Sequence, residues 1–150
     1  MEPDSLDDLR PPDSQGARSH DNGRMTVLIV DDEPAFCFAM AEILRLSGYQ
    51  VHQTHSAYEA LDLLRDITPD LILTDIMMPG ADGLDFIRQV RAHQAWARIP
   101  TVAVSAKAMV QDREAARLAG ADGYLAKPFS AQELKAMIRR FASRPDTAAA

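Results

Sequence analysis

Short apolar runs alternate with amphipathic segments along the middle of the chain. Five runs predict β-strands, at 26–30, 49–54, 70–74, 101–105 and 123–126. The run at 49–54 alternates with polar residues, which suits an edge strand, whereas the other runs are strongly apolar. Apolar strands separated by amphipathic helices are typical of a parallel sheet covered on both faces. The pattern therefore predicts an α/β fold.

The segments between the strands carry apolar residues at helical spacing. The predicted inward-facing residues are Phe36, Met40, Ile43 and Leu44, then Ala57, Ala60, Leu61 and Leu64, then Leu84, Ile87 and Val90, and finally Leu134, Met137, Ile138 and Phe141. The predicted start and stop signals are Pro34, Gly48, Gly83 and two capping boxes, Ser56 with Glu59 and Ser130 with Glu133. The Ala-rich segment 107–119 lacks a clear apolar stripe, so we expect its helix to be the weakest of the five.

Composition restricts the partners of this domain. The chain has 150 residues, of which 47% are hydrophobic and 25% charged, and its formal net charge is −6. A nucleic-acid-binding face needs clustered basic residues, so this balance argues against direct nucleic-acid binding. The longest apolar run, 35–41, is far shorter than the roughly 20 residues that span a bilayer, and no membrane contact is expected. The single cysteine, Cys37, suits a reducing compartment, which predicts a cytoplasmic protein.

Two segments at the ends of the chain are predicted to be disordered tails. Residues 1–24 are acidic, rich in Pro, Gly and Ser, and without a periodic apolar pattern, and residues 144–150 are similar. The residues between them, 25–143, form the predicted domain. Because so few residues follow it, the sequence favours a single-domain protein whose output is a contact with another protein.

Polar side chains gather at the ends of the predicted strands. They are Asp31, Asp32 and Glu33 after the first strand, Asp75 after the third, Ser105 at the end of the fourth and Lys127 after the fifth. Ligands of open parallel sheets bind beyond these carboxyl ends. Clustered carboxylates raise one another's pKa unless a cation lies among them. An all-oxygen set with few acids favours Mg²⁺ over Ca²⁺, with Mn²⁺ as an alternative ion.

This set of residues suits phosphoryl transfer. An ammonium and a hydroxyl opposite a metal ion match the three equatorial oxygens of a transferring phosphoryl group. Asp75 stands alone on the central strand, between the metal acids and the Lys127 and Ser105 pair, so we predict that it is the nucleophile. Each residue alone has an ordinary structural explanation, and the prediction depends on the four strand ends together.

Three segments, 27–33, 75–83 and 123–129, resemble the receiver domain of two-component response regulators. The similarity extends from about Met25 to Ala142. It implies a flavodoxin-like (βα)5 fold, with a doubly wound five-stranded parallel sheet in the order 2-1-3-4-5 and helices on both faces. It also implies a single-domain response regulator that promotes only its own phosphorylation and dephosphorylation.

Carried over position by position, the resemblance implies a role for each site residue. Asp75 resembles the phosphoacceptor, which also contacts the metal, and Asp31 and Asp32 resemble the metal acids. The backbone carbonyl of Met77 is implied as a further metal ligand. Lys127 resembles the lysine that pairs with the phosphoryl group and is followed by a cis peptide bond.

The resemblance also implies a switch. Ser105 and Tyr124 resemble the hydroxyl and aromatic switch residues: Ser105 moves to bond the phosphoryl group, and the Tyr124 ring then turns inward. The face formed by the fourth helix, fifth strand and fifth helix changes shape as a result. Met77 and Lys107 occupy the two positions that, in the family, tune the lifetime of the phosphoryl group.

The implied phosphodonor is a histidine kinase or a histidine phosphotransfer protein, and the implied binding partner of the phosphorylated domain is a downstream effector protein. The domain itself is expected to be a monomer or a weak, phosphorylation-dependent dimer. An intermediate phosphorelay carrier and a receiver fragment of a hybrid histidine kinase are alternatives. An aspartyl-phosphate phosphatase is disfavoured, because Met77 stands where those enzymes carry a second acid. A receiver used only for docking is disfavoured by the complete set of site residues.

Overall fold

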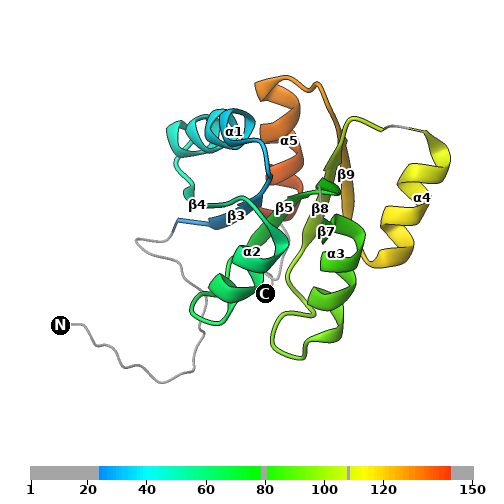
Figure 1. The fold of residues 1–150 in the computed structure, drawn as a ribbon. Helices are drawn as coiled ribbons and strands as arrows, with labels where there is room; N and C mark the ends of the chain where they lie inside the picture. Colours follow the sequence, from blue (N-terminus) through cyan, green and yellow to red (C-terminus); the bar gives the residue numbers. More distant parts are fainter. Residues whose placement is uncertain (1–23, 79–80, 108, 143–150) are drawn as a thin grey trace.

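Five parallel strands form the central layer of the computed structural model, which describes residues 24–78, 81–107 and 109–142 (Figure 1). They are β3 (Thr26–Val30), β4 (Gln50–Thr54), β5 (Leu71–Asp75), β8 (Thr101–Ser105) and β9 (Gly123–Ala126). Their order across the sheet is β4-β3-β5-β8-β9, and every neighbouring pair is parallel. This is the second, first, third, fourth and fifth of these strands along the chain, so the predicted flavodoxin-like order is confirmed.

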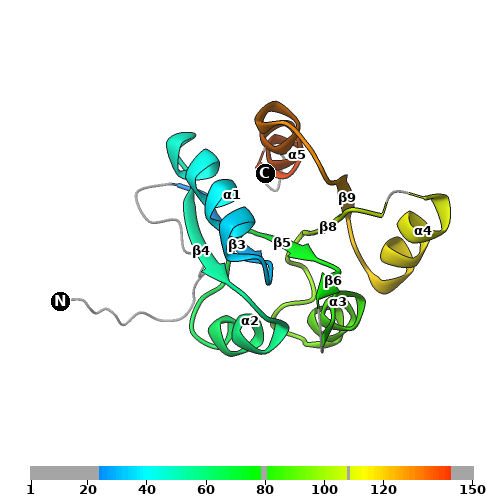
Figure 2. The ribbon, with the colours of Figure 1, turned by 45° about the horizontal axis from the view of Figure 1, so that its top comes forward.

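Helices cover both faces of the sheet (Figure 2). They are α1 (Pro34–Leu46), α2 (Ala57–Leu64), α3 (Gly83–Ala92), α4 (Val110–Ala119) and α5 (Ala131–Ala142). One apolar cluster joins α1 and α5 to the sheet, and two others join α2, α3 and α4 to its opposite face. Among the described residues, no helix has both the length and the apolar character needed to cross a membrane.

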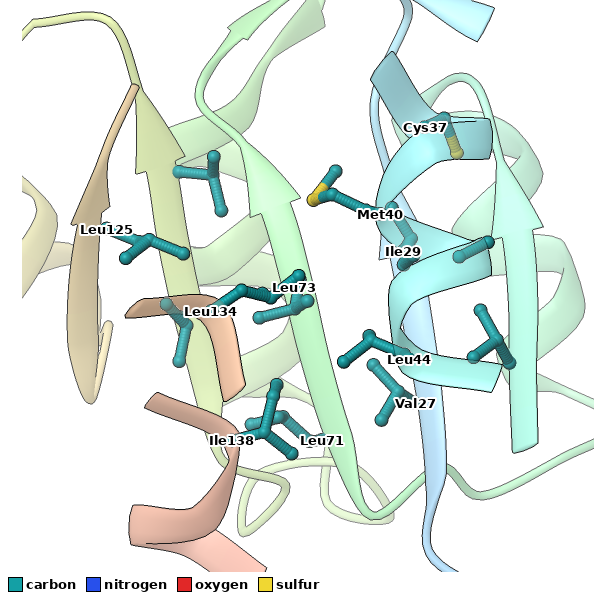
Figure 3. Close-up of a cluster of buried hydrophobic side chains, with 14 residues drawn as sticks. Val27, Ile29, Cys37, Met40, Leu44, Leu71, Leu73, Leu125, Leu134 and Ile138 are labelled. Carbon is teal, nitrogen blue, oxygen red and sulfur yellow. The ribbon is translucent and has the colours of Figure 1, made fainter. Parts of the chain in front are cut away.

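The three central strands are buried as their apolar runs predict. All five residues of β3, β5 and β8 are buried, whereas the edge strand β4 is partly exposed, and so is β9 at the other edge of the sheet. Side chains alternate between the faces of a strand. On one face, Val27 and Ile29 of β3 therefore pack with Leu71 and Leu73 of β5 beneath α1 and α5 (Figure 3). Because the residues on each face of the central strands pack against helices, a shift of one residue would turn apolar side chains to the wrong face, which fixes the register of these strands.

The structure differs from the predicted elements at a few boundaries. The third strand is one residue further along the chain than predicted, so Asp75 is its last residue rather than the residue after it. Asp70 instead precedes the strand, and its carboxylate accepts a hydrogen bond of 2.8 Å from the Thr26 backbone N–H. A short antiparallel pair, β6 (Met77–Met78) and β7 (Ala81–Asp82), was not predicted. The predicted tails lie outside the described residues except for Arg24, and the domain boundaries stay predictions.

Helix α4 is held mainly at its carboxyl end. Ala116 and Ala119 are its two buried residues. The guanidinium of Arg91, on α3, donates hydrogen bonds to the carbonyls of Gly120 (2.9 Å) and Ile99 (2.8 Å) and pairs with the carboxylate of Asp122. Arg91 therefore fastens the residues that follow α4 to the end of α3, while little apolar surface holds the rest of the helix.

Cys37 is a buried core residue of α1. Burial raises the pKa of its thiol to about 11, and the negative charge of Asp31 adds to this. The thiolate is the reactive form, so at pH 8 we expect Cys37 to react with Ellman's reagent roughly a hundredfold more slowly in the folded protein than after unfolding in guanidinium. Absorbance of the released thiolate measures the two rates. Equal rates in the folded and unfolded protein would contradict a buried thiol.

Candidate functional site

The carboxyl ends of two strands, β3 and β5, bring acidic residues together at one edge of the sheet. Asp31 follows β3 and is fully buried, and Asp75 ends β5 and is 5% exposed. Asp32 is half-buried beside them, and one carboxylate oxygen from each of Asp31, Asp32 and Asp75 lies within 4.8 Å of the others. Carboxylate oxygens are the donors that a hard divalent cation prefers. The donor set therefore fits Mg²⁺.

Lys127, which follows β9, points its ammonium into this acidic group. Its Nζ lies 3.2 Å from Asp31 Oδ2, 3.3 Å from Asp75 Oδ2 and 3.2 Å from Glu33 Oε1. Burial lowers the pKa of Lys127, but the negative charges of Asp31 and Asp75 outweigh it and the net shift is upward. Lys127 is therefore a permanent cation in this site at neutral pH.

One lysine does not neutralise the buried acids. Burial raises the pKa of Asp31, and the neighbouring charge of Asp75 adds to this effect. A hydrogen bond from the backbone of Glu33 and the charge of Lys127 act in the opposite direction. The combined negative charge of the carboxylates of Asp31, Asp32 and Asp75 exceeds the single positive charge of the Lys127 ammonium. A bound divalent cation would offset this excess negative charge.

Backbone amides hold the two buried carboxylates in place. The N–H of Glu33 donates to Asp31 Oδ1 and the N–H of Met77 donates to Asp75 Oδ1, each at 2.9 Å. In both residues the other oxygen, Oδ2, faces Lys127. Each carboxylate is thus fixed by one oxygen and presents the second to the ammonium. The predicted use of the Met77 carbonyl as a ligand stays a prediction.

One aromatic ring lies beside the Lys127 ammonium, and a second packs against the first. Its Nζ is 4.1 Å from the centroid of the Phe36 ring, and Phe129 packs edge-on against Phe36 with centroids 5.5 Å apart. The peptide bond between Lys127 and Pro128 is cis, as expected. Sequence reasoning placed Glu33 among the strand-end acids but gave it no role, and it did not assign Phe36 to the site. Their one signal was position, since Glu33 ends the acidic run and Phe36 lies in the first turn of α1.

The predicted switch residues meet at the backbone of Lys107. The buried hydroxyl of Ser105 accepts a hydrogen bond of 3.0 Å from the Lys107 N–H. The hydroxyl of Tyr124, a half-buried residue of β9, donates to the Lys107 carbonyl. The guanidinium of Arg113 on α4 lies 4.9 Å from the Tyr124 ring centroid. The backbone of Lys107 therefore connects Ser105, at the end of β8, to Tyr124, whose ring contacts Arg113 of α4.

Comparisons with known proteins agree on one family. The family model described as response regulator receiver domain matches residues 27–139. The transcriptional regulatory protein TrcR of Mycobacterium tuberculosis is 38% identical over 119 residues, which are 79% of this chain and 46% of TrcR. The chain spans about half the length of the curated relatives it matches.

Solved structures give the same result. A putative response regulator from Chloroflexus aurantiacus has a TM-score of 0.77 and 34% identity, with 81% of this chain and 99% of that one covered. The receiver domain of the sensor histidine kinase PA1611 from Pseudomonas aeruginosa has a TM-score of 0.75 and 32% identity, with 81% and 99% covered. That structure has a magnesium ion coordinated in its active site cleft.

Proposed function

Because the chain belongs to the family of response regulator receiver domains, we propose that Asp75 accepts a phosphoryl group in a Mg²⁺-dependent reaction. The observation that carries this proposal is the position of Lys127 between two buried carboxylates, 3.2 Å from Asp31 and 3.3 Å from Asp75. The bond from Asp75 to phosphorus forms while the bond between phosphorus and the donor's leaving group breaks. Hydrolysis of the resulting acyl phosphate by water later restores the carboxylate.

Each residue of the site has one task in this reaction. The Met77 N–H fixes Asp75 Oδ1, so that Oδ2, on the side of Lys127, is the oxygen left to attack. Lys127 then pairs with a phosphoryl oxygen and stabilises its negative charge. Asp31 and Asp32 would hold Mg²⁺, which neutralises charge on the transferring group when it is bound.

The proposal is tested by incubating the protein with acetyl phosphate and measuring its intact mass. We expect one phosphoryl group per chain in the presence of Mg²⁺ and none when EDTA removes the ion. Hydroxylamine cleaves acyl phosphates, so it should return the mass to that of the free chain. Incorporation that persists in EDTA or survives hydroxylamine would assign the phosphate to another type of residue.

Mg²⁺ should also stabilise the fold, because it binds a cluster that exists only in the folded chain. At ten times its dissociation constant, the ion is expected to add about 1.4 kcal/mol to the free energy of unfolding. Urea unfolding in MgCl₂, compared with NaCl at equal ionic strength, measures this difference. Asp32→Asn should reduce the stabilisation, whereas Asp66→Asn, at an exposed acid after α2, should leave it intact. The same gain in Asp32→Asn as in the unchanged protein would remove Asp32 from the metal site.

For the donor, we propose a histidine kinase or a histidine phosphotransfer protein. Return of the phosphoryl group to such a protein would favour the phosphorelay carrier over a terminal regulator. Hydrolysis of unrelated phosphoesters at many turnovers per site would instead support a phosphatase, which lacks support here because Met77 provides an amide and no second acid. The cytoplasmic location and the stand-alone architecture stay predictions.

For the output, we propose the face formed by α4, β9 and α5. Tyr124 is tied to Lys107, so movement at Ser105 reaches this face through one residue. A hollow beside Tyr124 is lined by Arg113, Ala116, Arg117, Ala121, Asp122 and Gly123 as well as by Tyr124 itself. Its shape therefore depends on where the Tyr124 ring lies. Exposed Val110 and Leu118 on α4 offer apolar contacts to an effector protein or, more weakly, to a second copy.

A further inference from the structure

The ammonium of Lys127 has already used its hydrogen-bond donors. A lysine ammonium carries three N–H donors and no acceptor. Asp31, Glu33 and Asp75 each have a carboxylate oxygen within 3.3 Å of the Lys127 Nζ. The ring of Phe36 lies against the same nitrogen, 4.1 Å from centroid to Nζ. A phosphoryl oxygen can therefore reach Lys127 at hydrogen-bond distance only if one of these partners moves away.

The three carboxylates differ in how readily they can leave. The side chains of Asp31 and Asp75 are 0% and 6% exposed, and each is also held by a backbone N–H. The side chain of Glu33 is 65% exposed. Water can solvate a carboxylate released from an exposed pair, whereas a buried carboxylate that loses its partner is left uncompensated. Glu33 is therefore the partner that costs least to displace.

Glu33 is also free to move without damage to its helix. It is the N-cap residue of α1, yet its side chain makes no capping hydrogen bond. Its backbone does the structural work, because its carbonyl accepts from the Cys37 N–H and its own N–H donates to Asp31. Movement or truncation of the side chain leaves these backbone bonds in place.

We propose that Glu33 is a positioning residue that occupies, in the unphosphorylated domain, the Lys127 donor that the phosphoryl group takes over. This inference rests on the proposed function of Asp75 and Lys127. The Glu33 carboxylate holds the ammonium in place before transfer and competes with the phosphoryl oxygen for it. It turns toward solvent once the phosphoryl group is bound. Glu33 thus lowers the affinity of the site for phosphoryl-like anions.

Beryllofluoride, which mimics the phosphoryl group, tests this inference in the full chain with saturating Mg²⁺. Amide NMR shifts followed during a titration give its dissociation constant. Glu33→Ala is expected to tighten binding by about two- to fivefold, the range of an exposed ion pair, and Glu33→Gln to tighten it in the same direction. Because salt screens exposed pairs, the difference should shrink between low and high ionic strength. A structural role for Glu33 would not produce tighter binding with this salt dependence.

The matched control is Asp66→Asn, which removes an equal charge from an exposed position after α2. It should bind beryllofluoride as the unchanged protein does. Unchanged or weaker binding by Glu33→Ala overturns the inference and leaves the function of Asp75 intact. An equal gain in Asp66→Asn also overturns it, since net charge alone would then explain the effect. If the unchanged protein and Asp66→Asn both fail to bind beryllofluoride, the proposed function itself fails.

Discussion

Asp75→Asn is expected to abolish phosphoryl incorporation. The amide oxygen that replaces the carboxylate oxygen is neutral and a poor nucleophile, so the rate should fall by at least about three orders of magnitude. Intact mass after incubation with acetyl phosphate and Mg²⁺ measures the loss. The substitution also removes a buried negative charge beside Asp31, so we expect the folded state to be as stable as before, or more so.

Asp85→Asn is the matched control, because it makes the same chemical change on the exposed surface of α3. The carboxylate of Asp85 pairs there with Arg88, and its side chain is 61% exposed. This variant should incorporate phosphoryl groups at the rate of the unchanged protein. Persistent incorporation in Asp75→Asn would remove Asp75 from the acceptor role, and loss in both variants would point to a requirement unrelated to the site.

Gly83→Ala is expected to cause the largest loss of stability. Gly83 begins α3, and a Cβ at this position would lie 2.3 Å from Ile76 Cα and 2.4 Å from the Asp75 carbonyl oxygen. Both contacts are with backbone atoms, so α3 and the end of β5 must move apart. Overpacking of this kind should lower the free energy of unfolding by about 3 kcal/mol, as measured by urea unfolding.

Gly123→Ala is the corresponding control in β9. There the nearest atom to an added Cβ is Met137 Sδ at 3.1 Å, the end of a flexible side chain that can give way. We expect a loss below about 1 kcal/mol. Because the Gly83 contact is with Asp75 itself, Gly83→Ala should also weaken beryllofluoride binding. Equal destabilisation by the two substitutions would show that the close approach of α3 to β5 is not tightly constrained.

The sheet could be predicted from sequence because its three central strands are fully buried. A short apolar run such as 27–30 is typical of a buried strand, and the polar residues of 49–54 indicated a strand at the edge of the sheet. The short pair β6 and β7 could not be predicted, since strands of two residues have no periodicity to detect. The capping box of Ser130 and Glu133 forms as predicted. The box of Ser56 and Glu59 forms in part: Ser56 accepts from the Glu59 N–H, but the Glu59 carboxylate accepts from the His55 N–H instead of the Ser56 N–H.

The candidate site could be predicted in part for the same topological reason. Parallel strands end at one edge of the sheet, so the acids at the carboxyl ends of β3 and β5 approach the lysine that follows β9. The contact between Glu33 and Lys127 could not be predicted, because the strand topology does not fix the direction of an exposed side chain. The role of the Lys107 backbone could not be predicted either, because any residue type can make backbone hydrogen bonds.

Helix α4 buries few residues, and this affects which of its positions tolerate substitution. Ala116 and Ala119 are its contribution to the core, and the Arg91 contacts secure the turn that follows it. The outward positions of this helix, Val110 and Leu118 among them, can therefore be exchanged without loosening the domain. On the proposed output face, such substitutions would change which effector protein binds without altering the residues around Asp75.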